Sequence, residues 1–343
     1  MSSRYPGGLI TAADNTPSST ASTGVWKLEE AALFTNQDKW QQPLGDVGFW
    51  AGGEDASGYS ATIDRIQIAT TGNAIDFGDL SLGADDGPST SNTTRALIFG
   101  GQGTSGPYGR VQYYNMSNVG TQGDFGDLSQ ARFNSGSAMS NGTRGVTGAG
   151  NLSTGQTNVI DYFTIASLGD YLDFGDLTVA RNQGAGGSNS TRGIFSGGQG
   201  AGGFSARVNV IDYITIASTG NAIDFGDLSA NRTARPGDVT TSTRLVIGGG
   251  YETANVNTME YVTIGSTGNM TDFGDLTLIK RGNGGVSNAT RGVFGGGSGD
   301  TANLNVMDYI TIGSTGNATD FGDLQAGKKV CVGATSNAHG GLQ

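Results

Sequence analysis

Apolar and polar residues in this chain alternate in short runs that are typical of β-strands packed on both faces. The clearest run is VMDYITI at 306–312. In an extended chain, Ile310 and Ile312 lie on one face of this run. Met307 and Tyr309 lie on the other face. A sheet with one solvated face alternates more cleanly than this. The run therefore predicts a strand that is buried between two neighbouring sheets.

The pentapeptide DFGDL sets the period of the chain. Successive copies are 48, 49, 51, 48 and 48 residues apart. A period near fifty indicates a propeller-type array of repeated sheets. We therefore interpret DFGDL as a structural unit with six copies, and not as six catalytic sites. The copies span 76–80, 124–128, 173–177, 224–228, 272–276 and 320–324.

One full repeat unit, residues 281–324, divides into four short extended runs. A Thr-Gly-Asn turn at 315–317 separates the last two runs, and Gly-Asn tolerates the positive φ of a tight hairpin. Four strands in a unit of this length form one propeller blade. The sequence therefore predicts an all-β, six-bladed propeller. The four runs are 284–289, 290–296, 305–312 and 318–324.

The two ends of the repeat region complement each other. GFWAGG at 48–53 aligns with the second strand of a unit, so the first unit lacks its opening strand. The segment at 328–341 contains SNAHG, which aligns with the opening strand of a unit, and no further blade follows it. We predict that residues 328–339 supply the inner strand of the blade begun by 47–53, because this pairing closes the ring.

The repeated pentapeptide also predicts packing. We expect each DFGDL phenylalanine to lie between neighbouring sheets, and each leucine, at opposite parity, to face the other neighbour. We expect the carboxylates to pair with recurring basic residues. One set follows a threonine, and the other lies four positions after the leucine. They are Arg95, Arg144, Arg192, Arg244 and Arg291, and Arg132, Arg181, Arg232 and Lys280.

Composition narrows the classes of function. The 343 residues carry a formal net charge of −11, which argues against a nucleic-acid partner. We find no run of 18 apolar residues and no leader-like segment, so we expect no membrane span and no signal peptide. His339 and Cys331 are the only histidine and cysteine, so we expect no metal and no cofactor. We expect His339 in a terminal loop and Cys331 in the closing strand.

The carboxylates also allow two catalytic interpretations besides the structural one. Asp-Phe-Gly is also a protein-kinase motif, but that site needs a phosphate loop, a strand lysine and a His-Arg-Asp loop. The sequence contains none of them. Glycoside hydrolysis needs unique acids at the mouth of the ring, and this alternative stays open. The acids outside the repeat are Glu54, Asp55, Asp85, Asp86, Glu252 and Asp300.

The loops of a blade divide between the two ends of the ring. Loops after the second and fourth strands emerge at one end, where their sequences vary. Turns after the first and third strands emerge at the other, where TRG and TGN recur. Aromatic residues on variable loops suit sugar or protein recognition, although they could equally pack down on the ring. The candidates are Tyr59, Tyr108, Phe204 and Tyr251.

Residues 1–43 lie outside the repeat, and 44–343 form the expected propeller domain. The segment 11–23 is polar and without periodicity, which predicts an extended arm. The segment 24–40 predicts a short helix with apolar residues that need covering, either by the ring or by a partner. The candidate anchoring residues are Tyr5, Trp26, Leu28, Leu33, Phe34 and Trp40.

Glycine doublets follow the second run of several units, before the tyrosine-bearing strand. This order, with a period near fifty, resembles the kelch repeat over residues 46–341. The kelch tryptophan is absent, and the phenylalanine of DFGDL takes a comparable place. The doublets are Gly100-Gly101, Gly197-Gly198, Gly248-Gly249 and Gly295-Gly296.

The arm carries a second resemblance. YPGGLIT at 5–11, a Thr/Ser-rich stretch and STGVWKLEEA at 22–31 resemble the start of structural proteins of tailed phages, especially marine cyanobacterial ones. The resemblance implies a non-enzymatic virion component, a tail fibre, appendage or capsid decoration assembled in the host cytoplasm. It implies contacts with other virion proteins through 1–43, a homo-oligomer, and a host surface glycan or protein as ligand. The alternatives are a propeller hydrolase or lyase acting on surface polysaccharide, and an intracellular kelch adaptor.

Overall fold

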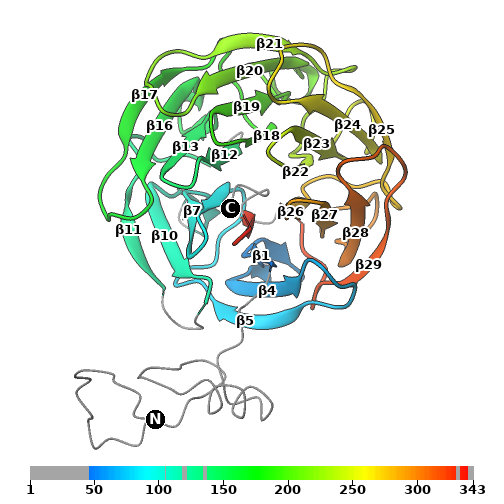
Figure 1. Ribbon diagram of the computed structural model, residues 1–343. Coiled ribbons are helices and arrows are strands. Elements are labelled where there is room, and N and C mark those ends of the chain that lie inside the picture. The colour runs from blue at the N-terminus through cyan, green and yellow to red at the C-terminus, as the bar shows by residue number, and fades with distance from the viewer. Residues whose placement is uncertain (1–45, 105, 118–121, 134–136, 330–332, 339–343) are drawn as a thin grey trace, which may run out of the picture. The chain divides into compact units, whose positions relative to one another are not determined.

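The computed structural model describes residues 46–338 except 105, 118–121, 134–136 and 330–332. These residues form a six-bladed β-propeller, in which six four-stranded antiparallel sheets surround a central axis (Figure 1). The fold class predicted from the repeat is confirmed. Residues 1–45 lie outside the described residues, and with them the expected arm, its helix and its six anchoring residues. Cys331 and His339 also lie outside them.

The innermost strand of each blade lines the central channel, and the second strand pairs with it on its outer side. The innermost strands are β30 (Gly333–Ser336), β6 (Ser89–Ser91), β12 (Ser137–Ser140), β18 (Ala185–Ser188), β22 (Gly237–Thr240) and β26 (Gly284–Ser287). The second strands are β1 (Val47–Ala51), β7 (Arg95–Phe99), β13 (Arg144–Gly148), β19 (Arg192–Ser196), β23 (Arg244–Gly248) and β27 (Arg291–Gly295).

The outer two strands carry the tyrosine-bearing runs and the DFGD segments. The third strands are β4 (Thr62–Gln67), β10 (Arg110–Asn115), β16 (Val159–Thr164), β20 (Val210–Thr215), β24 (Thr258–Thr263) and β28 (Val306–Thr311). The outermost are β5 (Ile75–Asp79), β11 (Gln122–Asp127), β17 (Leu172–Asp176), β21 (Ile223–Asp227), β25 (Thr271–Asp275) and β29 (Thr319–Asp323).

Short additional elements decorate the loops between second and third strands. Three blades carry a two-stranded hairpin there, and a fourth carries a 3-10 turn, the only helical element among the described residues. The elements are β2 (Glu54–Asp55) with β3 (Gly58–Tyr59), β8 (Gln102–Gly103) with β9 (Gly106–Pro107), β14 (Asn151–Leu152) with β15 (Gly155–Gln156), and η1 (Gly203–Ser205).

The ring closes as the sequence predicted. The last strand, β30, pairs antiparallel with the first, β1, so Gly48 lies opposite Ser336 and Ala51 opposite Gly333. The sheet order β30-β1-β4-β5 makes β30 the innermost strand of the first blade. No covalent bond joins the two ends of the ring, so hydrogen bonds and packing hold the closure.

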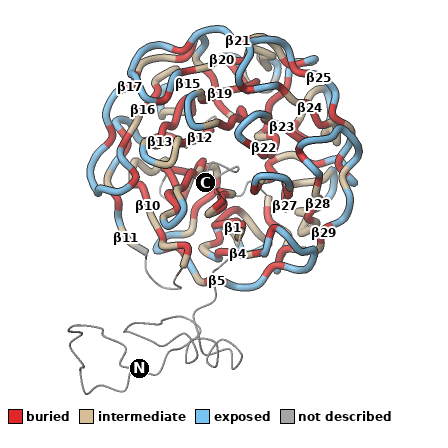
Figure 2. The backbone as a smooth tube through the Cα atoms, viewed as in Figure 1, coloured by how far each residue is buried: buried red, intermediate tan, exposed pale blue. Residues whose placement is uncertain are grey.

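The core lies between blades, and exposure increases towards the outer rim (Figure 2). The DFGDL phenylalanines are buried there, as predicted. The leucines were expected on the opposite side, and this was wrong: Phe321 and Leu324 belong to one cluster, as do Phe225 and Leu228. A β-bulge explains the difference, because an extra residue in the outer strand reverses side-chain parity.

The glycine of DFGDL makes this bulge and brings two blades close together. The pairing register shifts between Met307 and Asp308, opposite Gly322 and Asp320, so Phe321 is the extra residue. Gly322 has φ 142°, and a Cβ atom added there would lie 2.5 Å from the carbonyl oxygen of Gly72 in the next blade. Only glycine tolerates both conditions.

The TGN turn of one blade is hydrogen-bonded to the DFGD strand of the preceding blade. The Gly72 amide donates to the Phe321 carbonyl at 2.9 Å, and the Ala74 amide donates to the Asp323 carbonyl at 2.8 Å. In return, the Asp323 amide donates to Asn73 Oδ1 at 3.1 Å. The same pattern recurs at the four other junctions whose turns the structure describes, so DFGDL joins adjacent blades there and also forms the outer edge of each blade.

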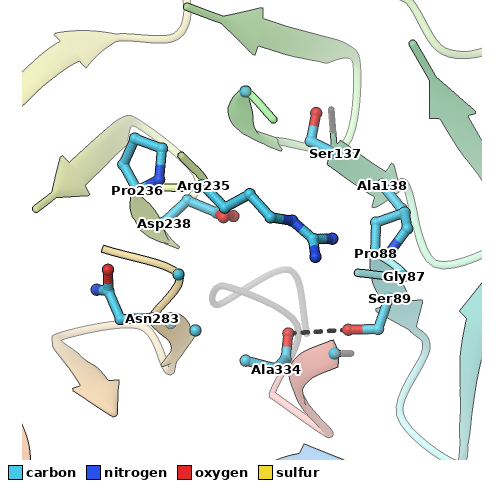
Figure 3. A pocket seen from close by; sticks show the side chains of 15 residues that line it. Gly87, Pro88, Ser89, Ser137, Ala138, Arg235, Pro236, Asp238, Asn283 and Ala334 are labelled. Atoms are coloured by element: carbon cyan, nitrogen blue, oxygen red, sulfur yellow. Dashed lines mark hydrogen bonds between the residues drawn. The ribbon is translucent and has the colours of Figure 1, made fainter. Parts of the chain in front are cut away.

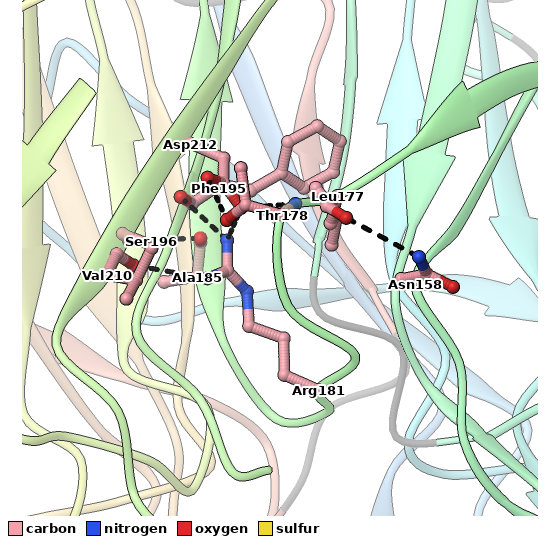
Figure 4. Close-up of polar contacts among 9 residues, drawn as sticks. All are labelled: Asn158, Leu177, Thr178, Arg181, Ala185, Phe195, Ser196, Val210 and Asp212. Carbon is pink, nitrogen blue, oxygen red and sulfur yellow. Dashed lines mark hydrogen bonds and ion pairs between the residues drawn. The ribbon is translucent and has the colours of Figure 1, made fainter. Parts of the chain in front are cut away.

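The recurring basic residues pair with acids of the third strand, and not with DFGDL as expected. Arg181 Nη2 lies 2.8 Å from Asp212 Oδ2 of the next blade and also donates to the Phe195 carbonyl (Figure 4). Both side chains are buried. The equivalent pairs are Arg132–Asp161, Arg232–Glu260, Lys280–Asp308 and Lys328–Asp64, at 2.6, 3.3, 2.5 and 2.7 Å.

The arginines that follow threonine make a different contact. Arg291 Nη1 donates to the Ile68 carbonyl of the next blade at 3.1 Å, and its guanidinium lies 4.6 Å from the centroid of the Tyr309 ring. Arg95, Arg144, Arg192 and Arg244 repeat both contacts. The expected pairing of these arginines with the DFGDL carboxylates was therefore wrong, because backbone carbonyls and a tyrosine ring contact each guanidinium instead.

One blade junction departs from the buried ion pair. Between the first and second blades, Ala84 stands where the other junctions have Arg or Lys, and Gln112 stands where they have Asp or Glu. Gln112 Oε1 instead accepts a hydrogen bond from Ser81 Oγ at 2.5 Å. Base and acid are thus both absent from this junction, which avoids leaving one buried charge without its partner.

Candidate functional site

The variable loops and the blade connectors meet at one end of the ring, here called the loop end. The connector that follows each outer strand pairs with the loop between second and third strands of the next blade. Asp85 pairs in this way with Gln102, and Arg281 with Ser298. The opposite end, which carries the TRG and TGN turns, is called the turn end. The predicted division of the loops between the two ends is confirmed.

The connectors at the loop end carry a different residue in every blade at one equivalent position. The fifth residue after each DFGDL leucine occupies one equivalent position in every connector. Two of these residues are basic and one is acidic. At the turn end, by contrast, the TRG and TGN turns recur with almost the same sequence in most blades. The six connector residues are Asp85, Phe133, Asn182, Thr233, Arg281 and Lys329.

A cavity of about 290 Å³ lies at the mouth of the central channel on the loop end. We call it the mouth cavity. Two ion pairs form part of its wall. Arg235 Nη1 lies 2.8 Å from Asp86 Oδ1, and Lys329 Nζ lies 2.9 Å from Glu54 Oε1. The lining residues are Glu54, Asp85, Asp86, Gln183, Ala234, Arg235, Arg281, Gly282, Ser298 and Lys329.

The backbone around the mouth cavity adopts a conformation that non-glycine residues rarely take. Asp86, Gln183, Ala234 and Arg235 have φ values of 60°, 56°, 63° and 53°. Among the described non-glycine residues, only Ala149 shares a positive φ with these four. Such strain is commonly found where a protein holds side chains in place for binding.

Burial changes the acidity of the mouth carboxyl groups. Burial, with the negative charge of Asp86 beside it, raises the pKa of Asp85 to about 7, although Arg235 opposes this. Burial also raises the pKa of Asp86, which the ion pair with Arg235 counteracts. Near neutral pH, the Asp85 carboxyl is therefore partly protonated, while Asp86 is held in an ion pair with the Arg235 guanidinium.

The channel below the mouth is narrow and polar, and all six blades contribute to it. Figure 3 shows the Arg235 side chain extending across the channel from its own blade, beside Asp238. Burial raises the pKa of Asp238 to about 7, and the charge of Arg235 partly opposes that rise. On the facing side, Ser89 Oγ donates to the Ala334 carbonyl at 3.1 Å.

Inner-strand hydroxyl groups connect the blades deeper in the channel. Ser140 Oγ donates to the carbonyl of Ser91, and Ser91 Oγ donates to that of Ser336, each at 2.8 Å. Ser336 Oγ in turn donates to the Ser287 carbonyl at 2.7 Å. The closing strand therefore takes part in the same circle of contacts as the other inner strands.

The four aromatic candidates lie on the loop end, but apart from one another. Tyr59 ends β3 and is 36% exposed. The Tyr108 ring lies against Gly103 of its own hairpin. Two guanidinium groups, of Arg207 and Arg281, lie 5.6 Å from the centroid of the Tyr251 ring. Phe204 belongs to η1, and its side chain lies outside the description. Ligand binding by these residues stays a prediction.

The six acids outside the repeat divide into two groups. Glu54, Asp85 and Asp86 come together at the mouth cavity. The others make local contacts: Asp55 Oδ1 accepts from the Ser57 hydroxyl at 2.5 Å, Glu252 pairs with Arg232, and Asp300 Oδ1 accepts from Asn255 Nδ2. Hydrogen bonding to Ser57 lowers the pKa of Asp55.

Sequence reasoning missed the basic half of this site and the acid within the channel. Arg235, Arg281 and Lys329 line the mouth cavity, and Asp238 lies beside Arg235 in the channel below. A signal existed for two of them, because Arg235 is the only basic residue and Asp238 the only acid at its position in the six units, whereas Arg281 and Lys329 share one variable position. Asp86 likewise occupies a connector position where no other unit has an acid.

Across the described ranges, no group of three or more His, Cys, Asp or Glu side chains is arranged to hold a metal ion. A search of the same residues for a helix long and apolar enough to cross a membrane finds none. No family model matches the chain, and no curated protein matches it.

Proposed function

We propose that the protein is a non-enzymatic, kelch-like virion component of a tailed phage that presents the loop end of its propeller to the host surface. In this proposal, residues 1–43 attach the protein to other virion proteins, and copies associate as a homo-oligomer. The propeller fold alone would be compatible with many functions. The support comes from how the two ends of the ring differ.

The position at which the chain enters and leaves the ring carries the proposal. Val47 begins β1 at the turn end, beside Gln67 at the end of β4. β30 runs antiparallel to β1, so Ser336 also lies at the turn end, opposite Gly48. The described chain therefore enters and leaves the ring at the turn end, opposite the variable loops and the mouth cavity, and the proposal takes the loop end as the end available for recognition.

The glycine doublets support the kelch-like part of the proposal. Gly197 and Gly198 have φ values of 59° and 110°, and a Cβ atom on Gly198 would lie 2.5 Å from the Asn182 carbonyl oxygen. The doublet thus lets the chain turn sharply at the end of the second strand while it packs closely against the connector that contains Asn182. In the fifth and sixth blades, the strained pairs are 249–250 and 296–297, one residue later than the sequence suggested.

One observation favours the enzymatic alternative. A glycoside hydrolase requires unique acids at the mouth of the ring, and Glu54, Asp85 and Asp86 line the mouth cavity. A carboxyl with a pKa of about 7, as in Asp85, could act as a general acid. Against this, Glu54 and Asp86 are each held in an ion pair with a cation.

Two experiments test the proposal. Purified phage particles are probed with an antibody to the propeller, and we expect the protein on the particle surface. Its absence from particles would overturn the virion assignment. The purified full chain is then incubated with host surface polysaccharide, and we expect binding without release of reducing ends. Release of reducing ends that Asp85→Asn abolishes would instead establish the hydrolase.

A further inference from the structure

The side chain of Asp85 has an unusual environment within the mouth cavity. Its residue is only 6% exposed, and its Oδ1 atom is buried with no hydrogen-bond partner among the described residues. The nearby Glu54 and Asp86 each contact a cation at 2.9 and 2.8 Å. A buried carboxylate oxygen without a donor is costly, so this atom points to a ligand that supplies one.

The charges of the cavity wall restrict the ligand. Asp85, Asp86 and Glu54 face the same space as Arg235, Arg281 and Lys329. A cationic ligand would meet three basic side chains, and an anionic ligand would meet three carboxyl groups. A neutral ligand with many hydroxyl groups avoids both conflicts, because each hydroxyl donates to a carboxylate and accepts from a guanidinium or an ammonium.

The size and polarity of the cavity restrict the ligand further. About 290 Å³ is at the lower limit of small-molecule pockets, which range from roughly 300 to 1,000 Å³. Ala234 supplies the only apolar side chain in the lining, so the wall offers little surface to an apolar ligand. Below the mouth, the channel narrows to a cavity of about 70 Å³, which prevents an extended polymer from passing through.

We propose that the mouth cavity binds one neutral monosaccharide unit at the end of a surface glycan, with Asp85 Oδ1 accepting a hydrogen bond from a sugar hydroxyl. This inference rests on the proposed function, because it names the ligand class that the loop end recognises. Arg235 is a positioning residue as well as a wall residue, since its ion pair holds Asp86 beside Asp85.

The test uses the full chain and free sugars. Neutral hexoses, N-acetylated hexosamines, amino sugars and uronic acids are titrated separately, with binding followed by ligand-detected NMR and calorimetry. We expect at least one neutral sugar to bind. Asp85→Asn should weaken that binding at least about tenfold, because it removes the carboxylate charge and replaces one carboxylate oxygen with an NH2 group that can only donate. The matched control Asp79→Asn, on the exposed outer strand β5, should leave it unchanged.

A second variant keeps the test decisive if Asp85→Asn changes folding. Ser298 lines the cavity, and its side chain donates to the neighbouring Gly299 carbonyl only locally. Ser298→Trp should fill the cavity and abolish sugar binding, with thermal unfolding measured to confirm that the variant folds. Binding that survives both variants would overturn the inference, as would a preference for charged sugars or no binding by any neutral sugar.

The inference and the proposed function fail in different ways. If Asp85→Asn abolishes sugar binding but not attachment of the protein to host cells, another surface makes the contact and the inference about the mouth is wrong. If the protein is absent from particles, the virion assignment is wrong, whereas the sugar titration still measures the site. Each outcome therefore contradicts either the sugar site in the mouth cavity or the virion assignment, and not both.

Discussion

At the turn end of the ring, five equivalent side chains accept a hydrogen bond from the outer strand of the preceding blade, four of them asparagines and one Asp170. At the loop end, equivalent connector positions carry Asp85 in one junction and Arg281 or Lys329 in others. The same repeat thus has one end that is constant and one that varies. Constant positions hold blades together, and the variable ones form the mouth cavity.

This comparison predicts that substitutions at constant positions lower stability, whereas substitutions at the mouth change binding. The largest effect is expected at the buried ion pairs. Arg181→Ala should lower the free energy of unfolding by about 3–5 kcal/mol, because it leaves the buried Asp212 carboxylate uncompensated. Adding Asp212→Ala to this variant should lower the free energy of unfolding by much less than Arg181→Ala alone does, because the uncompensated carboxylate is then removed. Chemical denaturation measures all three variants.

The control for the ion pair is an exposed one. Arg110 and Asp124 lie 3.4 Å apart with side chains that are 36% and 60% exposed. Arg110→Ala should therefore lower the free energy of unfolding by less than about 1 kcal/mol. Equal losses for Arg110→Ala and Arg181→Ala, or additive losses for the Arg181 and Asp212 variants, would contradict a stabilising role of the buried pair.

The next largest effect is expected at the bulge glycines. Gly274 has φ 138°, and a Cβ atom there would lie 2.5 Å from the Gly316 carbonyl oxygen. Gly274→Ala should lower the free energy of unfolding by about 2–3 kcal/mol, because the conformation is strained and the blades would have to separate. Thermal unfolding measures the loss. Gly265, with no atom near such a Cβ, is the matched control, and Gly265→Ala should have little effect.

A smaller effect is expected from the titration of the mouth. The Asp85 carboxyl has a pKa of about 7 in the folded chain and an ordinary value of 3.8 when exposed. The folded state therefore binds this proton more tightly, and its stability falls as pH rises between these values. Asp86, Arg235, Glu54 and Lys329 all influence this titration.

Removing the titrating group should remove its share of this pH dependence. At pH 8, Asp85→Asn should be more stable than the unsubstituted protein by about 1–3 kcal/mol, and the difference should vanish below about pH 4. Thermal unfolding across this range gives the curve. The stability of Asp85→Asn should still fall as pH rises over the same range, because Asp238 also has a pKa raised to about 7. A pH-independent difference between the two proteins would show that Asp85 is not the group responsible.

The smallest net effect is expected at the one junction without an ion pair. Ala84→Arg alone should destabilise the ring, because the new cation is buried beside Gln112. Adding Gln112→Asp should return the stability to within about 1 kcal/mol of the starting protein. A double-mutant cycle by chemical denaturation measures the coupling. Additive losses would mean that this junction differs from the others in more than these two side chains.

Much of the fold could be predicted because it depends on local pattern and on chain length. The strands β26 to β29 lie within the four runs predicted for 281–324. Closure was predictable because the first unit lacks the strand that the last segment supplies. Both inferences use only the spacing of the repeats and the alternation of apolar and polar residues. Both can be read from the sequence without knowing how neighbouring blades contact one another.

The remaining features depend on contacts between blades. The parity of Phe321 and Leu324 was predicted wrongly because the bulge requires the positive φ of Gly322, which depends on the neighbouring turn. The partner of Arg181 was predicted wrongly because acids occur in both outer strands, and distance alone decides between them. The mouth cavity is lined by residues of five connectors and two loops. These segments are far apart in the sequence and come together only when the ring closes.

The position of β1 in the first blade has a mechanical consequence. The strand is paired along four residues with β30 and along five with β4, both antiparallel. A tether at residue 46 would pull along the axis of β1, while the interstrand hydrogen bonds lie across it. Tension would thus load both ladders in shear, so that their bonds must rupture together.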